Sequence, residues 1–434
     1  MSLIEPNIEA APREDQAAAD DAPYRRQIAC LFDRSGFYRD KLSQAGFRSS
    51  DAVGGLADIA RLPFTEKDEP RASRSADEPI GAHCAATPDE IVRICSTSGT
   101  TGTPSYIPLT ASDIEAWVRT SARSFGASGV KRGDRVVSTY NAGPFVAGAA
   151  LDAFARLSLC HIPLAGGNTD RLIMAVEKLK PSVVALTPSY APHLAEWAEV
   201  RGVDLAKSSV ERLMVVGEPG RCEPAMRAKL EAAWGACVTE AMGIGDISPS
   251  LWGECEAKAG MHFSGRGFVH FELIDPASGA PVPLSDGAEG ELVLTHLVNR
   301  ASPLLSFRTR DHVRLGFGPC ACGRTAPRLR CIGRTDDMLI VRGVNLFPTA
   351  LREIVNEFAP ATTGVVMIKP RSAGVRQDPP LPVKVEAADP SQRELAERIR
   401  ARVREALLVA TEIELVAVGG LPRSEYKSKL VDRP

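Results

Sequence analysis

The stretch IVRICSTSGTTGTPS, residues 91–105, places a short β-branched run directly before a loop of glycines and small hydroxyl residues. Glycines let backbone N–H groups turn inward, and hydroxyls add donors that can rotate, so such a loop can hold an anion such as phosphate. It is not a Walker loop, because Gly102 is followed by Thr103 where that motif has lysine. An ordinary Ser/Thr-rich turn is the alternative. The residues predicted to bind phosphate are Ser96, Thr97, Ser98, Gly99, Thr100, Thr101 and Gly102.

The region around this loop alternates short apolar runs with amphipathic segments. The apolar runs lie at residues 91–95, 135–140, 159–164, 182–188, 212–217 and 236–242. Among the amphipathic segments, residues 110–125 begin with Thr110 and Asp113 at the spacing of a capping box. Such alternation predicts an α/β fold with a doubly wound, mainly parallel sheet, which binds ligands at the carboxyl ends of its strands. We expect the loop at Ser96 to lie at such an end.

The texture of the sequence changes twice after residue 243. Residues 268–297 are strand-like runs joined by Gly and Pro turns, which predicts an antiparallel subdomain. Residues 338–418 then give strand, helix, strand, strand, helix and strand, as expected for a small α+β domain. We therefore predict a loose, Ala- and acid-rich tail at 1–22, a large domain at 23–335 and a small mobile domain at 336–434.

Composition excludes several classes of function. The chain has 434 residues, 44% of them hydrophobic, and a formal net charge of −2, so it has no basic excess for nucleic acid. No uncharged apolar stretch is long enough to span a membrane. The first residues carry acids where a signal peptide needs basic and then apolar residues. We expect a soluble cytoplasmic protein that binds neither nucleic acid nor membranes.

Six segments, in order, resemble the motifs of the adenylate-forming superfamily of acyl-CoA synthetases. They are STSGTTGTP (96–104), GEP (217–219), EAMGIGD (240–246), PLLSFRTRD (303–311), GRTDDMLIVRGVNLFP (333–348) and PRSEYKSKLVD (422–432). The fifth segment is similar to the phenylacetate–CoA ligase subfamily. The resemblance implies that a carboxylate is activated on ATP with Mg²⁺ to an acyl-adenylate, which is then passed to coenzyme A.

The same resemblance assigns roles to single residues. Lys427 would bridge the carboxylate and the α-phosphate as a movable point charge, with Lys429 as a competing candidate. Asp336 would be the hinge about which the small domain turns between the two half-reactions. The nucleotide would contact Gly217, Glu218 and Pro219 on the adenine side, Asp311 on the ribose, and Arg334 on the ribose or α-phosphate. Coenzyme A would approach Arg342, Gly343 and Phe347.

The fourth and third motifs depart from the family pattern. Met242 stands for the aromatic that covers adenine, Gly245 for a hydroxyl near the α-phosphate, and Asp246 for the Glu that helps to hold Mg²⁺. The alignment of this motif rests on Gly243 and Glu240, and a shift by one residue is the alternative. Ser306 replaces the usual arginine. Methionine can still cover a ring, and aspartate can still reach a metal, so we expect activity to persist.

The resemblance also implies where the acyl pocket lies, and the residues there carry little charge, which favours an aromatic carboxylate such as an aryl or arylacetic acid. Its residues would be Tyr140, Asn141, Ala142, Gly143, Phe145, Gly166, Met242 and Ile244. Two alternatives remain open: an adenylating ligase with an amine, carrier protein or second acid as acceptor, and a nucleotide-binding relative without catalysis. The assembly, including a possible homodimer, is also open.

Four residues form a candidate zinc set. Cys255, His262, Cys320 and Cys322 supply soft ligands that suit tetrahedral Zn²⁺ better than Mg²⁺ or Ca²⁺. Free thiols are the alternative, because nothing local brings the two halves together. Some members of the subfamily that the chain resembles carry a structural zinc on Cys, His and a Cys-x-Cys turn. With all four positions filled, such a metal would be structural.

Overall fold

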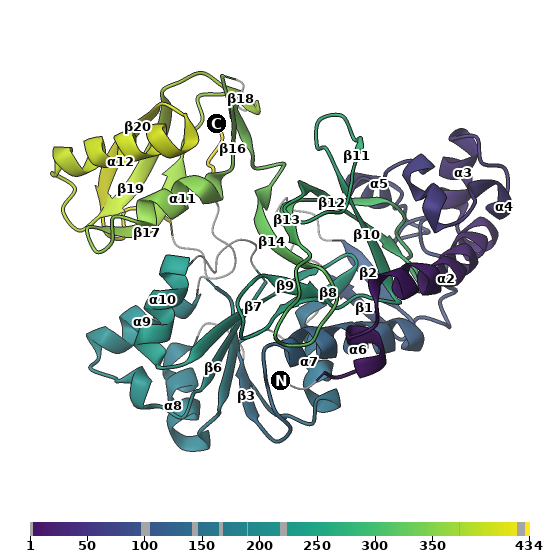
Figure 1. Cartoon of the computed structure of the whole chain (residues 1–434), viewed down its shortest axis with the longest axis horizontal. Helices are drawn as coiled ribbons and strands as arrows, with labels where there is room; N and C mark the ends of the chain where they lie inside the picture. The colour runs from purple at the N-terminus through teal and green to yellow at the C-terminus, as the bar shows by residue number, and fades with distance from the viewer. Residues whose placement is uncertain are drawn as a thin grey trace.

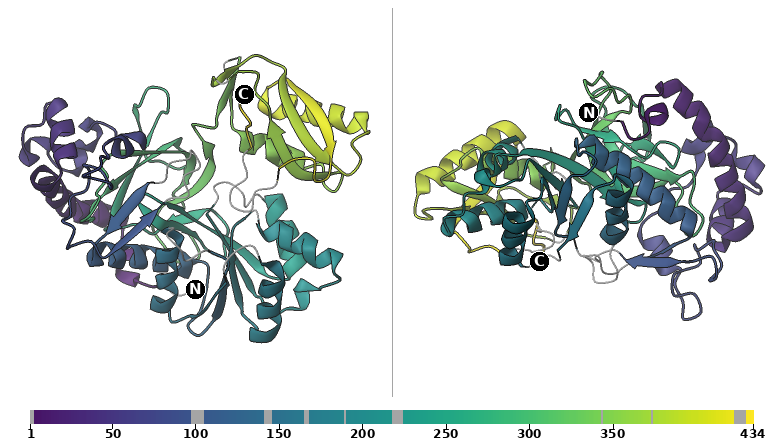
Figure 2. Two further views of the ribbon diagram at one scale, coloured as in Figure 1. Left: turned by 180° about the vertical axis from the view of Figure 1, so that it is seen from behind. Right: turned by 90° about the horizontal axis from the view of Figure 1, so that it is seen from below.

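A computed structural model describes residues 3–96, 105–140, 146–164, 168–188, 190–217, 224–342, 344–372, 374–422 and 430–434. The chain forms a large lobe and a smaller C-terminal lobe (Figure 1). The small lobe sits at one end of the large lobe and the N-terminal helices at the other (Figure 2).

The parallel part of the main sheet follows the predicted alternation. Its strands, in spatial order, are β4 (Cys160–Pro163), β3 (Arg135–Ser138), β5 (Val183–Leu186), β6 (Arg212–Val216) and β7 (Cys237–Ile244). One face packs against α8 (Thr169–Leu179), α9 (Tyr190–Val200) and α10 (Pro224–Trp234), and the other against α6 (Ala111–Ala127) and α7 (Val146–Arg156). A short 3₁₀ turn, η2 (Leu205–Lys207), precedes β6. The central strands β5 and β6 are buried along their whole length, and helices cover both faces, which confirms the doubly wound fold.

Helix α6 begins as the sequence predicts. The Thr110 side chain accepts from the backbone N–H of Asp113, and the Asp113 carboxylate accepts from the N–H of Thr110. This capping box satisfies donors that the first turn of a helix otherwise leaves unpaired.

The antiparallel part continues the same sheet rather than forming a separate one. Beyond β7 come β8 (Ser248–Glu254), β9 (Met261–Phe263), β14 (Arg328–Arg334), β13 (Phe307–Gly316), β12 (Glu289–His296), β10 (Val269–Ile274) and β11 (Pro281–Val282). β7 and β8 pair through Ala241↔Gly253 and Met242↔Trp252. The result is one twelve-stranded sheet across the large lobe.

The prediction for the strand before the phosphate loop is wrong in one respect. β1 (Arg93–Ser96) pairs antiparallel with β2 (Tyr106–Leu109) in a separate two-stranded sheet. The loop is therefore the connection of a hairpin, not the end of a strand of the parallel sheet. Loop residues 97–104 lie outside the described residues.

The predicted loose tail also differs from the structure. α1 (Pro6–Glu9) and α2 (Arg13–Arg34) are formed, and Glu9 is 6% exposed. Glu5 pairs with Arg119 and Arg123 of α6, so its charge is compensated by residues more than a hundred positions away. Further helical segments follow: α3 (Gly36–Gln44), α4 (Ser50–Val53), η1 (Leu56–Arg61) and α5 (Asp68–Ala72).

The small lobe has its own core, as expected for an α+β unit. β17 (Thr362–Ile368), β19 (Leu381–Ala387) and β20 (Thr411–Ala417) form one sheet, packed against α11 (Pro348–Asn356) and α12 (Arg393–Leu407). A second sheet contains β16 (Val344–Leu346), β15 (Leu339–Val341) and β18 (Arg376–Gln377). No helix among the described residues is long and apolar enough to cross a membrane.

Candidate active site

Many of the predicted site residues lie outside the described residues. These are Thr97, Ser98, Gly99, Thr100, Thr101, Gly102, Asn141, Ala142, Gly143, Phe145, Gly166, Glu218, Pro219, Gly343 and Lys427. Their roles stay predictions, and the site is built below from the described residues around them.

The carboxyl ends of the parallel strands gather several predicted residues at one edge. Tyr140 follows β3, Gly217 follows β6, and Gly243 and Ile244 end β7. The Tyr140 hydroxyl donates to the carbonyl of Leu186 at 2.6 Å or to that of Val216 at 3.0 Å. Its hydroxyl is thus used within the sheet, and its ring packs beside the adjoining core cluster.

The third motif lies at the end of β7. A Cβ on Gly243 would lie 2.0 Å from the carbonyl oxygen of Pro249, so only glycine fits against β8 here. Met242 is 6% exposed and packs with Trp252 in the core of the antiparallel part. Its contact with adenine stays a prediction.

Asp246, the candidate Mg²⁺ ligand, is paired with a lysine that sequence reasoning missed. Its Oδ2 lies 2.6 Å from Nζ of Lys67, which comes just before α5. Thr65 holds this segment, because its N–H donates to the carbonyl of Ser306 and its carbonyl accepts from the N–H of Arg308, both at 3.0 Å. Mg²⁺ would have to share or take over the carboxylate that Lys67 now contacts.

A cavity lies beside this ion pair. It is lined by Lys67, Arg71, Arg74, His83, Asp246 and the first residues after the predicted phosphate loop, Ser105 and Tyr106. Nε of Arg71 donates to Oγ of Ser105 at 3.0 Å. Burial, with the charge of Arg74, lowers the pKa of His83 to about 4, so this imidazole is neutral near pH 7. The surroundings of the loop are therefore cationic, although the loop itself has no lysine.

The ribose and hinge candidates stand together. Asp311 in β13 is 2% exposed and lies 3.4 Å from Nη1 of Arg334 at the end of β14. Arg334 also makes a two-pronged contact with Asp336, at 2.9 and 2.7 Å. The structure thus brings these three predicted residues into one group, since β13 and β14 pair with Asp311 opposite Arg334.

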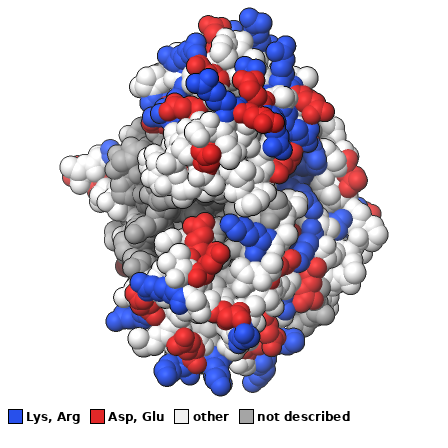
Figure 3. Space-filling view, turned by 90° about the vertical axis from the view of Figure 1, so that its left-hand side faces the viewer, with Lys and Arg blue, Asp and Glu red and all other residues white. Residues whose placement is uncertain are grey.

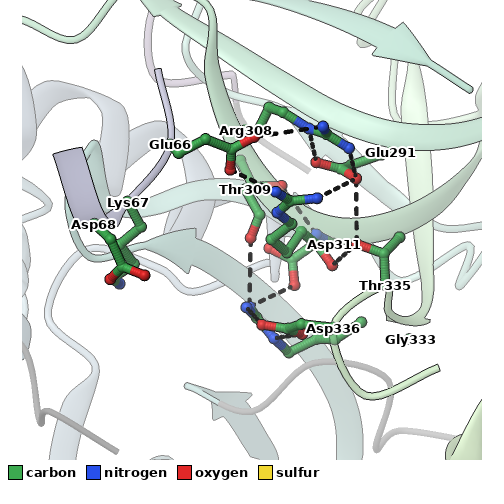
Figure 4. A network of polar contacts seen from close by, with 12 residues as sticks. Glu66, Lys67, Asp68, Glu291, Arg308, Thr309, Asp311, Gly333, Thr335 and Asp336 are labelled. Carbon is green, nitrogen blue, oxygen red and sulfur yellow. Dashed lines mark hydrogen bonds and ion pairs between the residues drawn. The ribbon is translucent and has the colours of Figure 1, made fainter. Parts of the chain in front are cut away.

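A network of charges behind Asp311 was not predicted (Figure 4). Glu291 of β12 has no exposed surface, and Arg308 contacts its two oxygens at 2.8 Å each. Arg310 lies 2.5 Å from Glu66 and 3.6 Å from Glu291. All of these are common charged residues scattered along the sequence, so only the fold could show that they converge.

Of the two predicted coenzyme A residues that the structure describes, Arg342 lies in the turn between β15 and β16, and Phe347 lies where the small lobe meets the large one. Arg342 is exposed and has a φ of 49°. The Phe347 ring lies 4.9 Å from the His312 ring of β13, across the lobe boundary. A Cβ on Gly333 would lie 2.9 Å from Cδ1 of Phe347, so the glycine of the fifth motif permits this close contact.

The predicted metal ligands also converge. Sγ of Cys255 lies 3.5 Å from Sγ of Cys320, and Sγ of Cys322 lies 3.4 Å from Nε2 of His262. The four ligand atoms lie within 4.8 Å of one another. A tetrahedral zinc with Zn–S bonds of about 2.3 Å spaces its ligands by about 3.8 Å, so the set fits this metal. Nδ1 of His262 faces the carbonyl of Ala326 at 3.3 Å, which leaves Nε2 as the ligand.

Two other histidines take the structural places expected of core residues. His296 is 3% exposed; its Nδ1 accepts from the N–H of Leu304 at 3.0 Å, and its Nε2 lies 3.1 Å from the carbonyl of Ile247. Nε2 of His161 lies 2.7 Å from Oγ of Ser138 on the neighbouring strand.

On the face shown in Figure 3, basic and acidic side chains are interspersed.

Comparison with known proteins places the chain in a family. Residues 36–296 match the family described as AMP-binding enzyme, and residues 343–433 match the AMP-binding enzyme C-terminal domain. Phenylacetate-coenzyme A ligase of Thermus thermophilus is 33% identical over 98% of this chain and 97% of its own length. The protein of the same name from Escherichia coli is 30% identical over 97% and 95%.

Solved structures agree. 2-Hydroxyisobutyryl-CoA ligase in the postadenylation state matches with a TM-score of 0.89 and 26% identity, over 99% of this chain and 92% of that one. The same enzyme in the thioesterification state matches with a TM-score of 0.73, over 99% and 91%. The six motifs, the group formed by Asp311, Arg334 and Asp336, and these similarities lead to one assignment: the chain belongs to the AMP-binding enzyme family of adenylate-forming ligases, in its phenylacetate–CoA ligase-like branch.

Proposed function

We propose that this protein is an ATP-dependent, AMP-forming ligase that activates an aromatic carboxylate as an acyl-adenylate and transfers the acyl group to coenzyme A. The observation that carries the proposal is the group formed by Asp311, Arg334 and Asp336. It combines a buried carboxylate suited to ribose hydroxyls, a guanidinium suited to phosphate, and the passage to a separately folded lobe.

Each half-reaction needs different help from the protein. In the first, carboxylate and α-phosphate are both anions, so cations and oriented dipoles must lower their repulsion as they approach. Lys427 is our candidate for the cation that bridges them. Asp246 would hold Mg²⁺, which supplies charge neutralisation of the phosphates. In the second half-reaction the thiol sulfur attacks the acyl carbonyl, and AMP leaves with the electrons of the acyl–oxygen bond.

The arrangement of the lobes supports a place in this cycle. One solved relative in different states matches this chain with TM-scores of 0.89 and 0.73 at 26% and 27% identity. Since sequence and fold are the same in the two comparisons, the difference reflects where the small lobe lies. We infer that the described arrangement corresponds to the state after adenylation, in which the small lobe still faces the nucleotide.

The acid is proposed as aromatic for two reasons. The described pocket candidates Tyr140, Met242 and Ile244 are apolar in their packing, and relatives over nearly the whole chain are named phenylacetate-coenzyme A ligase. A short hydroxy acid is the competing substrate class, since the similar solved structure is a 2-hydroxyisobutyryl-CoA ligase.

A substrate screen tests the proposal. Exchange of labelled pyrophosphate into ATP is measured with phenylacetate, benzoate and 2-hydroxyisobutyrate, and thioester formation is then followed with and without coenzyme A. We expect exchange with an aromatic acid and thioester only with coenzyme A. Exchange with 2-hydroxyisobutyrate alone would overturn the aromatic assignment. Release of the acyl group to an amine in place of coenzyme A would overturn the acceptor, and no exchange with any acid would favour a non-catalytic protein.

The Cys/His cluster belongs to the same proposal as a structural zinc site. Cys255, His262, Cys320 and Cys322 would fill a tetrahedral shell around zinc, which would leave no position for a substrate. Metal analysis of the purified protein should give one zinc for each chain. The absence of bound zinc after purification with zinc supplied would instead favour free thiols.

A further inference from the structure

The hinge segment contains Thr335, which is hydrogen-bonded to the large lobe. β14 ends at Arg334, and β15 of the small lobe begins at Leu339. Between them, the N–H of Thr335 donates to the carbonyl of Arg310 at 2.7 Å. Its Oγ1 lies 3.2 Å from Oε2 of Glu291 and 3.3 Å from the same carbonyl. Thr335 therefore belongs to the large lobe by both backbone and side chain.

The carboxylate that receives Thr335 is itself held firmly. Glu291 has no exposed surface, and a buried carboxylate needs a cation and donors for its lone pairs. Arg308 supplies a two-pronged contact at 2.8 Å, and Arg310 approaches to 3.6 Å. The hydroxyl of Thr335 completes this set. Figure 4 shows that Arg308 and Thr335 reach Glu291 from two different segments of the chain.

The other partner of Thr335 is a strained residue. Arg310 has a φ of 65°, which is unusual for a residue with a side chain, and the pairing of β12 with β13 shifts in register around it. Its guanidinium lies 2.5 Å from Glu66, which comes just before α5. Contacts with Glu66, Glu291 and Thr335 hold Arg310 in this conformation. Arg310 precedes Asp311, the residue proposed to bind the nucleotide, so these contacts also fix the position of Asp311.

The next residue is held differently. Asp336 pairs with the side chain of Arg334, at 2.9 and 2.7 Å, and this contact is half exposed. A half-exposed ion pair of this kind can separate, whereas Thr335 is hydrogen-bonded to Glu291 and to the backbone of Arg310 in the large lobe.

We propose that Glu291 and Thr335 are positioning residues that fix the large-lobe side of the hinge, so that rotation of the small lobe begins at Asp336 and leaves Asp311 in place. This inference rests on the proposed two-step function. Without the anchor, the pivot would spread backward into β14. The alignment of the small lobe for transfer to the thiol would then become less defined.

The test compares three substitutions in the full-length protein. Thr335→Val keeps the shape and removes the hydroxyl, while Thr335→Ser keeps the hydroxyl. The matched control is Thr363→Val in β17, whose Oγ1 lies 3.1 Å from Oε2 of Glu386, another carboxylate without exposed surface. Hydrogen exchange of the peptide covering residues 333–338 reports on the anchor, and single-turnover thioester formation reports on its use.

We expect Thr335→Val to speed exchange in this peptide by about tenfold and to slow thioester formation by about fivefold, with a smaller change in the KM for ATP. Thr335→Ser should restore both. Thr363→Val should leave residues 333–338 unchanged. Equal exchange in Thr335→Val and wild type would overturn the inference, as would an equal effect of the serine variant.

Failure of the proposed function looks different. If the wild-type protein shows no pyrophosphate exchange with any acid, the proposed function is wrong. Hydrogen exchange of residues 333–338 then still tests whether Thr335 anchors the hinge. If the wild type is active and Thr335→Val keeps both normal exchange and normal transfer, the anchor falls and the function stands.

Discussion

The two ends of the β13–β14 hairpin are closed in opposite ways. At the loop end, two cysteines of the hairpin meet Cys255, directly after β8, and His262 of β9. At the hinge end, Arg308 and Arg310 meet Glu66 and Glu291. Soft ligands of this kind suit a structural metal, while at the hinge end ion pairs with Arg308 and Arg310 hold the buried carboxylate of Glu291. The comparison teaches that the two ends of one hairpin are closed by different chemistry, thiols and an imidazole at one end and ion pairs at the other.

We expect the largest effect from the loss of one candidate metal ligand at the loop end. Cys322→Ser should reduce bound zinc to about a tenth or less and lower the melting temperature by about 5 °C or more, because structural zinc binding is folding free energy. Zinc content and thermal unfolding measure it. Cys160→Ser is the control, since Cys160 is exposed on β4. Unchanged zinc content in Cys322→Ser would show that Cys322 is not a zinc ligand.

The next effect concerns the hinge end. Asp311→Asn should raise the KM for ATP about 10- to 100-fold in pyrophosphate exchange, because hydrogen bonds to a charged group contribute about 1.5–3 kcal/mol. The melting temperature should change little by comparison with Cys322→Ser. Asp275→Asn, on an exposed turn after β10, serves as control. A KM for ATP equal to that of the wild type would contradict the ribose role of Asp311.

Removal of the metal should be felt beyond the loop. Arg324, two residues after Cys322, lies 2.8 Å from Glu9, and both side chains are buried. The N–H of Thr325 donates to the carbonyl of Glu9 at 3.0 Å. A chelator should therefore raise proteolytic cleavage within residues 3–13 by about tenfold, since the partner loop loses its shape. In Cys322→Ser the chelator should add nothing. Full protection of residues 3–13 from proteolysis after zinc release would show that the N-terminal segment does not depend on the shape of this loop.

We expect the smallest effect from a second carboxylate, Glu272, which lies near Glu291 but has a raised pKa. Glu272 lies on β10, next to the strand of Glu291, and burial raises its pKa from 4.5 to about 7. A raised acid pKa gives stability that is fully present below pH 4.5 and is lost as pH rises through 7. Glu272→Gln should thus gain a few degrees of melting temperature over wild type at pH 8 relative to pH 5. Glu199→Gln, exposed in α9, should show no such trend. A pH-independent difference would place the carboxylate in water.

Features that repeat along the chain, and clusters of chemically rare residues, can be predicted well from the sequence. β-branched runs locate the parallel strands because burial on both faces requires them, and Cys320 with Cys322 indicates a metal because thiols so close are uncommon. Asp311, Arg334 and Asp336 are found by motif, and the fold brings them together.

What escapes prediction is long-range pairing of common residues. Glu66 and Arg310 are 244 positions apart, and nothing in either neighbourhood names the other. The N-terminal segment looks disordered by composition, yet Glu5 pairs with arginines in α6 and Glu9 pairs with Arg324, two residues after Cys322. Lys67 was missed for the same reason. The hairpin of β1 and β2 was misplaced because a short apolar run does not state which sheet it joins.

The continuous sheet has a consequence for anyone who recombines relatives of this protein. β7 and β8 share backbone hydrogen bonds, so a crossover between them would splice two halves of one hydrogen-bonded surface with unmatched twist. The small lobe has a separate core, and the chain enters it after Thr335. Domain exchange should therefore succeed at residue 336 and fail near residue 246.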